Sequence, residues 1–211
     1  MLARFLVALG AMIAVVAASN FLVQFPVEAT LAGIDLAGIL TWGAFTYPIA
    51  FLVTDLTNRH FGPKTARLVV AGGFAVAVLV SIWLASPRIA IASGAAFLLA
   101  QLLDVSIFDR LRHSAWWQAP LVSSLLGSIL DTVVFFGLAF APAFAGLDLA
   151  FGQDDTSLGF AVPLFGIGGE VPLWQSLALG DFIVKLLVAA ALLAPYRVLR
   201  SMIADRAPVA A

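Results

Sequence analysis

The stretch WQAPLVSSLLGSILDTVVFFGLAF, residues 117 to 140, contains a single charged side chain, Asp131. A run of about 20 mostly apolar residues is long enough to cross the hydrocarbon core of a bilayer as a helix. The rest of the chain has the same character, because 63% of its 211 residues are hydrophobic and only 11% are charged. Such a composition excludes a water-soluble domain with a wetted surface. The sequence therefore predicts an all-α integral membrane protein.

Six segments have the length and hydropathy of a membrane-spanning helix. The predicted helices cover residues 4–22, 36–57, 66–85, 89–107, 117–140 and 173–194. Short segments with proline, glycine or charged residues separate most of them, and the longest connection, residues 141–172, is rich in glycine and proline. Because no linker or internal repeat divides the chain, we expect one transmembrane domain over residues 1–211, folded as a bundle of six helices.

Basic residues are distributed unequally between the two sets of connections. With six spans, nine of them fall on one side of the membrane and only Arg88 falls on the other. The nine are Arg4, Arg59, Lys64, Arg67, Arg110, Arg112, Arg197, Arg200 and Arg206. Because lysine and arginine are enriched in cytoplasmic loops, both termini are predicted to be cytoplasmic. The alternative, that residues 4–22 form a cleaved signal peptide, leaves five spans and conflicts with this charge pattern.

Several charged residues lie within the predicted spans or at their ends. A charge at the centre of a spanning helix costs about 2.5 to 3.5 kcal/mol, so such groups normally face a partner or a cavity. They are Asp55, Asp104, Asp131, Asp181 and Lys185. Asp181 and Lys185 have the i, i+4 spacing of an intrahelical ion pair, and Asp55 has Arg59 one turn later. Structural pairing is therefore the alternative to a ligand-binding role for these acids.

Asp131 has no basic residue within four positions on either side, so its partner must come from another helix, from water or from a ligand. It continues a stripe of small and polar residues at helical spacing, formed by Pro120, Ser124 and Gly127. Similar stripes on the fourth and second predicted helices contain Gly94, Phe97, Gln101, Asp104 and Phe108, and Phe45, Pro48, Leu52 and Asp55. Small residues are also typical of a close helix contact. Polar groups beside aromatic rings on three helices favour a buried polar pocket.

The sequence lacks the common motifs of enzymes and metal sites. There is no HExxH, no GxSxG and no phosphate-binding loop. The chain has no cysteine, which excludes disulfides and thiolate chemistry. His60 and His113 are predicted to lie in cytoplasmic loops, where histidines are usually solvated. We therefore expect neither an enzyme nor a metal or cofactor site, and the expected surroundings are membrane lipid, with no nucleic-acid partner.

Five segments that follow one another over most of the chain contain the intramembrane polar residues described above. They are ASNFLVQFP (18–26), LTWGAFTYPIAFLVTDLTNRHFG (40–62), AQLLDVSIFDRLR (100–112), WWQAPLVSSLLGSILDTVVFFGLAF (116–140) and DFIVKLL (181–187). These segments closely resemble the queuosine precursor transporter family, also called the vitamin uptake transporter or VUT family. The resemblance implies a multi-pass carrier of the bacterial inner membrane that imports 7-cyano-7-deazaguanine (preQ0), 7-aminomethyl-7-deazaguanine or a related deazapurine for tRNA modification. Ser128 stands where many members of the family have asparagine, so the resemblance assigns no substrate contact there.

The implied substrate has a hydrogen-bonding pattern that matches these residue types. A deazaguanine presents a ring N–H and an exocyclic amine side by side, which one carboxylate accepts, and a carbonyl that needs a donor. Its flat faces suit aromatic neighbours. Asp131, or Asp104 with Gln101, is expected to supply the acceptors. The full predicted set for substrate binding is Asn20, Trp42, Phe45, Tyr47, Asp55, Gln101, Asp104, Asp131, Asp181 and Lys185, with Asn20 and Lys185 as donors and Trp42, Phe45 and Tyr47 as stacking residues.

Two other classes of function are compatible with the sequence. In the first, the chain is the substrate-binding subunit of an ATP-energised vitamin importer. In the second, it is a structural membrane protein without a ligand. The sequence also leaves open whether a coupling ion, proton or sodium, drives transport, and whether the protein forms a homo-oligomer.

Overall fold

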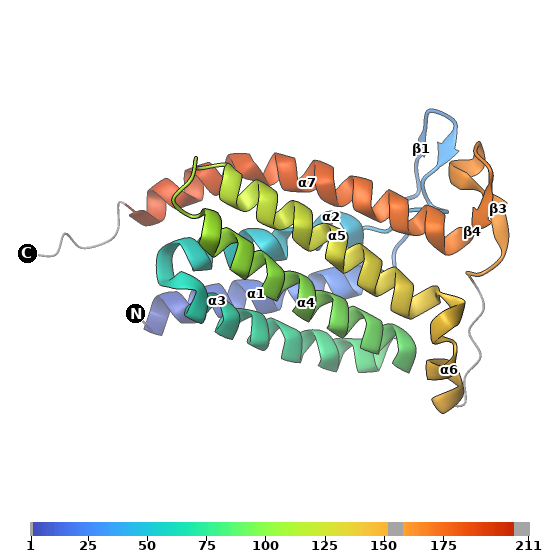
Figure 1. The fold of residues 1–211 in the computed structure, drawn as a ribbon, viewed down its shortest axis with the longest axis horizontal. Coiled ribbons are helices and arrows are strands. Elements are labelled where there is room, and N and C mark those ends of the chain that lie inside the picture. Colours follow the sequence, from blue (N-terminus) through green and yellow to red (C-terminus); the bar gives the residue numbers. More distant parts are fainter. Residues whose placement is uncertain (1, 152–157, 205–211) are drawn as a thin grey trace, which may run out of the picture.

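The structure, a computed structural model, describes residues 2–151 and 158–204. It is a bundle of long helices with two small antiparallel hairpins at one end (Figure 1). The helices are α1 (Leu2–Leu22), α2 (Gly43–Thr46), α3 (Ile49–Leu84), α4 (Pro87–Leu111), α5 (Gln118–Phe140), α6 (Gly146–Ala150) and α7 (Leu173–Ala204). The strands are β1 (Thr30–Leu31), β2 (Ile34–Asp35), β3 (Ala161–Pro163) and β4 (Glu170–Pro172), and two short 3-10 helices are η1 (Pro142–Phe144) and η2 (Leu164–Gly166).

Five helical stretches within the described residues are long and apolar enough to cross a membrane. One of them, Gly43–Leu84, has 42 residues, about twice what a single crossing needs. It breaks at Gly62, where φ is 81° and ψ is 170°, and Figure 1 shows the two halves of α3 running in opposite directions. The described chain therefore crosses the bundle six times, as the sequence predicts, although no loop separates the second and third crossings.

The dipeptide Gly62–Pro63 explains the reversal inside α3. A positive φ lies in the left-handed region that glycine adopts readily, and helices often end with such a residue. Proline favours the first position of a helix, because its missing N–H would have no partner there, and it disfavours helical geometry at the preceding residue. His60 therefore lies in the last helical turn before the break, which corrects the prediction that it lies in a loop.

The ends of two predicted spans also need correction. Residues 36–42 form turns after the β1–β2 hairpin, so the second crossing begins at Gly43 with the short helix α2. Pro48 separates α2 from α3, because its missing N–H removes one helical hydrogen bond. The last predicted span is too short, since α7 continues through Pro195 to Ala204.

The helices pack in sequence order around a core that is mostly apolar near α1. Helix α1 packs on α3, α3 on α4, α4 on α5, and α5 on α7. Met12, Val70 and Phe97 are fully buried where α1, α3 and α4 meet. Gly127 of α5 lacks a side chain, which lets the ring of Phe51 approach it closely. This packing brings α3, α4, α5 and α7 together around the polar side chains described below.

The outer surface of the bundle is apolar, as contact with lipid requires. Leu68, Leu79, Val133 and Leu187 each expose more than half of their surface. Trp83, at the end of α3, is 88% exposed, and Trp117, just before α5, is 41% exposed at the other end of the bundle. Tryptophan is enriched at both membrane–water interfaces, so these positions fit a bundle that spans the bilayer.

The first turn of α1 and the last turn of α7 lie at the same end of the bundle (Figure 1). We call this the terminal end; it also contains the reversal at Gly62 and the connection between α4 and α5. The opposite end, called the hairpin end, contains β1–β2, α6 and β3–β4. The basic residues assigned to the cytoplasmic side lie near the terminal end, whereas Arg88 lies at the hairpin end; Arg206 is outside the described residues.

Candidate substrate-binding cavity

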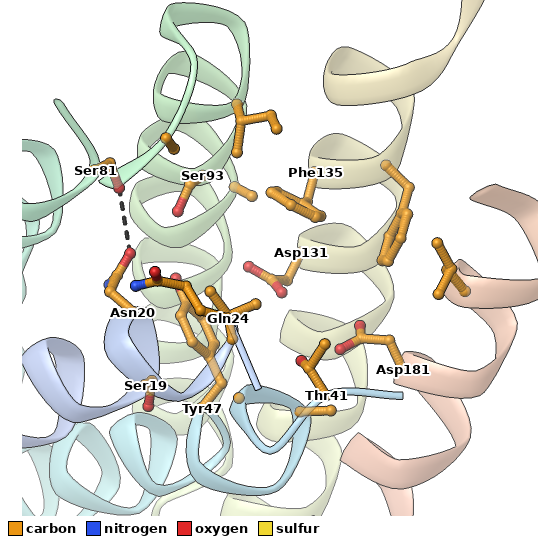
Figure 2. A pocket seen from close by; sticks show the side chains of 18 of the residues that line it. Ser19, Asn20, Gln24, Thr41, Tyr47, Ser81, Ser93, Asp131, Phe135 and Asp181 are labelled. Carbon is orange, nitrogen blue, oxygen red and sulfur yellow. Dashed lines mark hydrogen bonds between the residues drawn. The ribbon is translucent and has the colours of Figure 1, made fainter. Parts of the chain in front are cut away.

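A cavity of about 530 Å³ lies between the helices, in the half of the bundle nearer the hairpin end. Its walls come from α1, α3, α4, α5, α7 and the segment that leads into α2. Figure 2 shows polar side chains from several of these elements directed into it. The polar lining residues are Ser19, Asn20, Gln24, Thr41, Tyr47, Ser81, Ser86, Ser93, Asp131, Asp181 and Lys185. Its volume is typical of a site for a small organic molecule.

Lys185 of α7 joins two carboxylates in the wall of the cavity. Its ammonium nitrogen lies 2.6 Å from Oδ2 of Asp131 and 2.5 Å from Oδ2 of Asp181. The side chains of Lys185 and Asp131 are each 5% exposed, and that of Asp181 is 17% exposed. The same nitrogen lies 5.7 Å from the centroid of the Tyr47 ring, which is a cation–π contact. Two acids and one base leave one excess negative charge, which favours a ligand rich in hydrogen-bond donors or one with a positive charge.

The partner of Asp131 comes from another helix, which is one of the three sources that its isolation in the sequence leaves open. The expected i, i+4 pair between Asp181 and Lys185 is also present. The two interactions share one ammonium group, so they connect α5 to α7 through a single charged cluster. Thr132 of α5 adds to this connection, because its hydroxyl donates to Oδ2 of Asp181 at 3.2 Å.

Asn20 and Tyr47 place further hydrogen-bonding groups in the lining of the cavity. The hydroxyl of Ser81 donates to Oδ1 of Asn20 at 3.2 Å (Figure 2). Tyr47 and, on α4, Ser93 both line the cavity. Asn20 is thus held by a serine of a neighbouring helix, α3.

Aromatic rings of α5 form an apolar wall next to Asp131. Phe135, Phe136 and Phe140 all line the cavity, and the rings of Phe135 and Phe136 meet edge to face with centroids 5.0 Å apart. In Figure 2 Phe135 lies one turn from Asp131 on the same helix. These phenylalanines are absent from the predicted set, although the i, i+4 spacing between Asp131 and Phe135 is a signal present in the sequence.

The structure brings half of the predicted residues together in the cavity: Asn20, Tyr47, Asp131, Asp181 and Lys185. Two predicted stacking residues lie elsewhere. Trp42 is 49% exposed, and Phe45 packs against an apolar cluster that includes Leu40 and Val184. Of the predicted aromatic residues, only Tyr47 therefore contributes to the lining.

Asp55, Gln101 and Asp104 form a separate polar cluster nearer the terminal end, outside the lining of the cavity. The hydroxyl of Thr54 donates to Oε1 of Gln101 at 2.6 Å, which joins α3 to α4. The hydroxyl of Ser123 donates to Oδ1 of Asp55 at 3.4 Å, which joins α5 to α3. The polar stripes of the sequence are therefore divided between two sites.

Arg59 closes the bundle at the terminal end and does not form an ion pair with Asp55 in the described part of the chain. Its guanidinium donates to the hydroxyl of Tyr196 at 3.2 Å and to the carbonyl of Arg112. It also lies over the ring of Phe108, 5.2 Å from the centroid. These contacts join α3, α4 and α7 on the side of the polar cluster that faces away from the cavity.

The small-residue stripe of α5 serves as a packing seam along most of its length and as a cavity wall at its end. A Cβ atom at Gly127 would lie 2.7 Å from Cε1 of Phe51, and Pro120 and Ser124 are buried in the same seam. Asp131, one turn beyond Gly127, lines the cavity. Both interpretations of the stripe therefore apply, at different heights of the bundle.

Arg88, the one basic residue assigned to the outer side, is buried and paired. Its guanidinium lies 2.5 Å from Oδ2 of Asp148 and donates to the carbonyls of Leu138 and Ala141 at 2.8 and 2.7 Å. It thereby fixes the start of α4 to α6 and to the end of α5, close to the cavity. No pattern in the sequence indicates this pairing, because the two charged residues are far apart along the chain.

A polar, charged cavity inside a bundle that crosses the membrane six times is the arrangement of a multi-pass transporter. Residues 41–199 match the family described as "Putative vitamin uptake transporter". The chain belongs to this family, and it is a multi-pass transporter of the bacterial inner membrane and not an enzyme.

Curated relatives have more specific names. The chain is 38% identical over 178 residues to the "Probable queuosine precursor transporter" of Haemophilus influenzae, an alignment that covers 72% of this chain and 74% of that protein. It is 40% identical over 147 residues to the "Queuosine precursor transporter" of Escherichia coli, which covers 60% of this chain and 64% of that protein, slightly less than two thirds. A Bacillus subtilis protein named "Probable queuosine precursor transporter" is 26% identical over 136 residues, 51% of this chain and 59% of that protein. No solved structure is significantly similar to this one.

Proposed function

We propose that the protein imports a queuosine precursor, 7-cyano-7-deazaguanine, 7-aminomethyl-7-deazaguanine or a related deazapurine, into the bacterial cell for tRNA modification. The names of the relatives support the substrate class. The observation that carries the proposal is the cavity itself, in which Asp131, Lys185 and Asp181 lie beside the aromatic wall of α5.

The carboxylate of Asp131 is the proposed anchor for the deazaguanine ring. The contact with Lys185 uses its Oδ2 atom, and a carboxylate has acceptor sites on both oxygens. The ring N–H and the exocyclic amine of the substrate donate to this carboxylate side by side, as two-pronged donors do. Phe135, one turn away, provides a flat apolar surface for the bicyclic ring.

The charge of the cavity bears on the choice between substrates. One excess negative charge remains in the cluster of Asp131, Asp181 and Lys185 after pairing. The neutral cyano compound binds the carboxylate of Asp131 through its N–H donors alone. The aminomethyl compound also has a positively charged amine, which can form an ion pair with Asp181. We therefore propose that both compounds bind and compete for the same cavity.

The direction of transport follows from the proposed orientation of the bundle. The basic residues at the terminal end support a cytoplasmic position for that end and for both chain termini. The cavity then lies toward the outer side, and the contacts of Arg59 with Tyr196 and Arg112 close the path to the cytoplasm. This arrangement corresponds to the state that receives substrate from outside.

The substitution Asp131→Asn tests the proposal. Asparagine has nearly the same size but replaces one acceptor oxygen with a donor, so binding should weaken by about 1.5 to 3 kcal/mol, roughly 10- to 100-fold in affinity. Lys185 keeps its contact with Asp181, so no unpaired charge is left and protein levels should stay normal. The measurement is queuosine in the tRNA of a bacterium that cannot make the precursor, fed nanomolar 7-cyano-7-deazaguanine.

Asp109→Asn is the matched control, because Asp109 is a partly exposed acid of α4 whose ion pair with Arg112 lies outside the cavity. It should support as much queuosine as the unmodified protein. Normal queuosine with Asp131→Asn at limiting precursor would contradict the proposed role, and Asp131 would then be a structural partner of Lys185 alone.

A further inference from the structure

The cluster around Asp55 and Asp104 is separate from the cavity and has no role in the proposed substrate contacts. Asp55 is 2% exposed and Asp104 is 0% exposed. Their neighbours meet across α3 and α4, because Thr54 donates to Gln101 and Asn58 donates to the carbonyl of Val105, so the two acids lie at the same height where these helices face each other. Ser123, which donates to Asp55, precedes Asp131 by eight residues on α5, which is about 12 Å along the helix axis. The two acidic sites therefore lie at different heights of the bundle.

The two carboxyl groups have no cationic partner within residues 2–151 and 158–204, where neither forms an ion pair with lysine, arginine or histidine. On α3 the charged group that faces them is Arg59, one turn from Asp55. Its Nε and Nη1 atoms donate to Tyr196 and to the carbonyl of Arg112, and its Nη2 atom is buried without a hydrogen-bond partner. Helix α7 contributes the hydroxyl of Tyr196, and α5 contributes the hydroxyl of Ser123. Burial of two adjacent negative charges in such surroundings is strongly unfavourable.

Polar atoms around the pair are buried without hydrogen-bond partners in the described structure. They include both carboxyl oxygens of Asp104, the side-chain oxygen of Asn58 and the side-chain nitrogen of Gln101. Asn58 lies one turn from Asp55 on the same helix face, and its amide donates to the carbonyl of Val105 at 2.9 Å, next to Asp104. Buried polar groups are nearly always paired. The unpaired oxygens of Asp104 and Asn58 are acceptors, and they indicate a site for a small positively charged ligand, whereas the nitrogen of Gln101 is a donor.

A proton fits this site better than a metal cation. Two ionised carboxylates are both acceptors and cannot bond to each other, whereas one proton removes a charge and supplies the donor.

We infer that Asp55 and Asp104 share one proton and form the coupling site through which proton entry drives deazapurine import. The inference rests on the proposed function. The proton comes from the outer solution, resides between the two carboxyl groups, and leaves to the cytoplasm, so no covalent bond to the substrate is made or broken. The coupling site is thus a second ligand site, for a proton, in addition to the substrate cavity.

The position of the pair explains how it acts on the cavity. Asp55 lies in the first half of α3, residues 49–61, which follows Pro48 and ends at the reversal at Gly62. Loss of the proton leaves two carboxylates that repel each other, which separates this half of α3 from α4. Because Tyr47 precedes Pro48 and lines the cavity, movement of this segment changes the substrate site.

The test uses the purified chain alone in lipid vesicles with labelled 7-cyano-7-deazaguanine, which also excludes an ATP-driven module. With the membrane potential clamped, an inward gradient of one pH unit should allow up to about tenfold accumulation of a neutral substrate per coupled proton. An inward sodium gradient of the same size should produce none. Exchange of labelled for unlabelled substrate is measured in parallel, without a gradient.

Asp104→Asn and Asp55→Asn are expected to abolish accumulation while they reduce exchange far less, and Asp109→Asn on the same helix is the matched control. A readout that needs no substrate is the infrared band of a protonated carboxyl group at neutral pH, expected in the unmodified protein and lost in both variants. The unmodified protein must show this band if the proton site exists. The band therefore tests the site even where a variant does not reach the membrane.

The outcomes separate the two proposals. Exchange without accumulation under a pH gradient, accumulation driven by sodium, or absence of the carboxyl band would overturn the proton site and leave the proposed function intact. Absence of both exchange and uptake in the unmodified protein would instead contradict the proposed function, and the infrared band would then decide the proton site by itself.

Discussion

At the scale of single residues, the ammonium of Lys185 determines the charge of the substrate cavity. It compensates two carboxylates from α5 and α7 at 2.6 and 2.5 Å. Removal of one member of a buried ion pair typically costs about 3 to 5 kcal/mol, because the remaining charge stays in a poorly solvated place. Removal of Lys185 leaves two carboxylates without a partner, whereas removal of either acid leaves the lysine with one partner.

We therefore expect Lys185→Ala to be far more damaging than Asp181→Ala. Lys185→Ala should lower the free energy of unfolding by about 3 to 5 kcal/mol, and the double variant with Asp181→Ala should recover part of this loss, because only Asp131 remains uncompensated. Thermal unfolding of the detergent-solubilised proteins measures all three variants. Strict additivity of the single effects would show that the two groups are not coupled.

The sequence predicts much of this charged cluster but only part of its pairing. Asp131, Asp181 and Lys185 are visible as charges within apolar spans, and the i, i+4 spacing of the last two indicates their contact. That Lys185 also reaches Asp131 depends on the rotation and height of α7 against α5, which hydropathy does not determine. The same reason applies to Arg88 and Asp148, whose contact joins segments that are distant in the sequence.

At the scale of elements, the tight seam between α3, α4 and α5 holds the two polar sites in place. Gly127 lies in the middle of this seam, where a Cβ atom would be 2.7 Å from a ring carbon of Phe51 and 3.4 Å from the carbonyl oxygen of Ala100. The ring is packed in the core and the carbonyl belongs to the backbone, so displacement of either neighbour costs free energy. Close approach of these helices therefore depends on glycine at this position.

Gly127→Val is expected to destabilise the bundle by about 1 to 3 kcal/mol, the usual cost of overpacking a well-packed core. Gly137→Val is the matched control on the same helix, because nothing lies within 4 Å of a Cβ atom there. Both variants introduce the same β-branched residue, so helix propensity cancels in the comparison. The temperature at which each solubilised protein loses its monodisperse elution profile gives the result, and equal losses for the two variants would argue against the seam.

The sequence predicts the helices correctly where hydropathy alone determines their ends. Helices α4 and α5 lie within a few residues of their predicted ranges. The start of the second crossing was predicted wrongly, because residues 36–42 are apolar enough to continue a helix, yet they form turns that cover the hairpin end. The extension of α7 past Pro195 was missed for the opposite reason, since proline there is tolerated within the helix.

At the scale of the whole molecule, the two ends of the bundle differ in structure and in charge. The hairpin end contains the cavity and the buried pair of Arg88 and Asp148, and the terminal end is closed by Arg59 and its partners. The proposed import requires that the same cavity later opens at the terminal end. The contacts of Arg59 with α4 and α7 must then break, and the proton pair lies between these contacts and the cavity.

The orientation of this asymmetric bundle can be measured with single cysteines, because the chain contains none of its own. Glu28→Cys and Glu170→Cys lie at exposed positions of the hairpin end, and Ser114→Cys lies at an exposed position between α4 and α5 at the terminal end. In spheroplasts, a membrane-impermeant maleimide should label the first two, and Ser114→Cys should react only after the membrane is permeabilised. Labelling of Ser114→Cys in intact spheroplasts, with protection of the other two, would show that the bundle has the opposite orientation in the membrane. The cavity would then face the cytoplasm, and the proposed direction of transport in this state would be wrong.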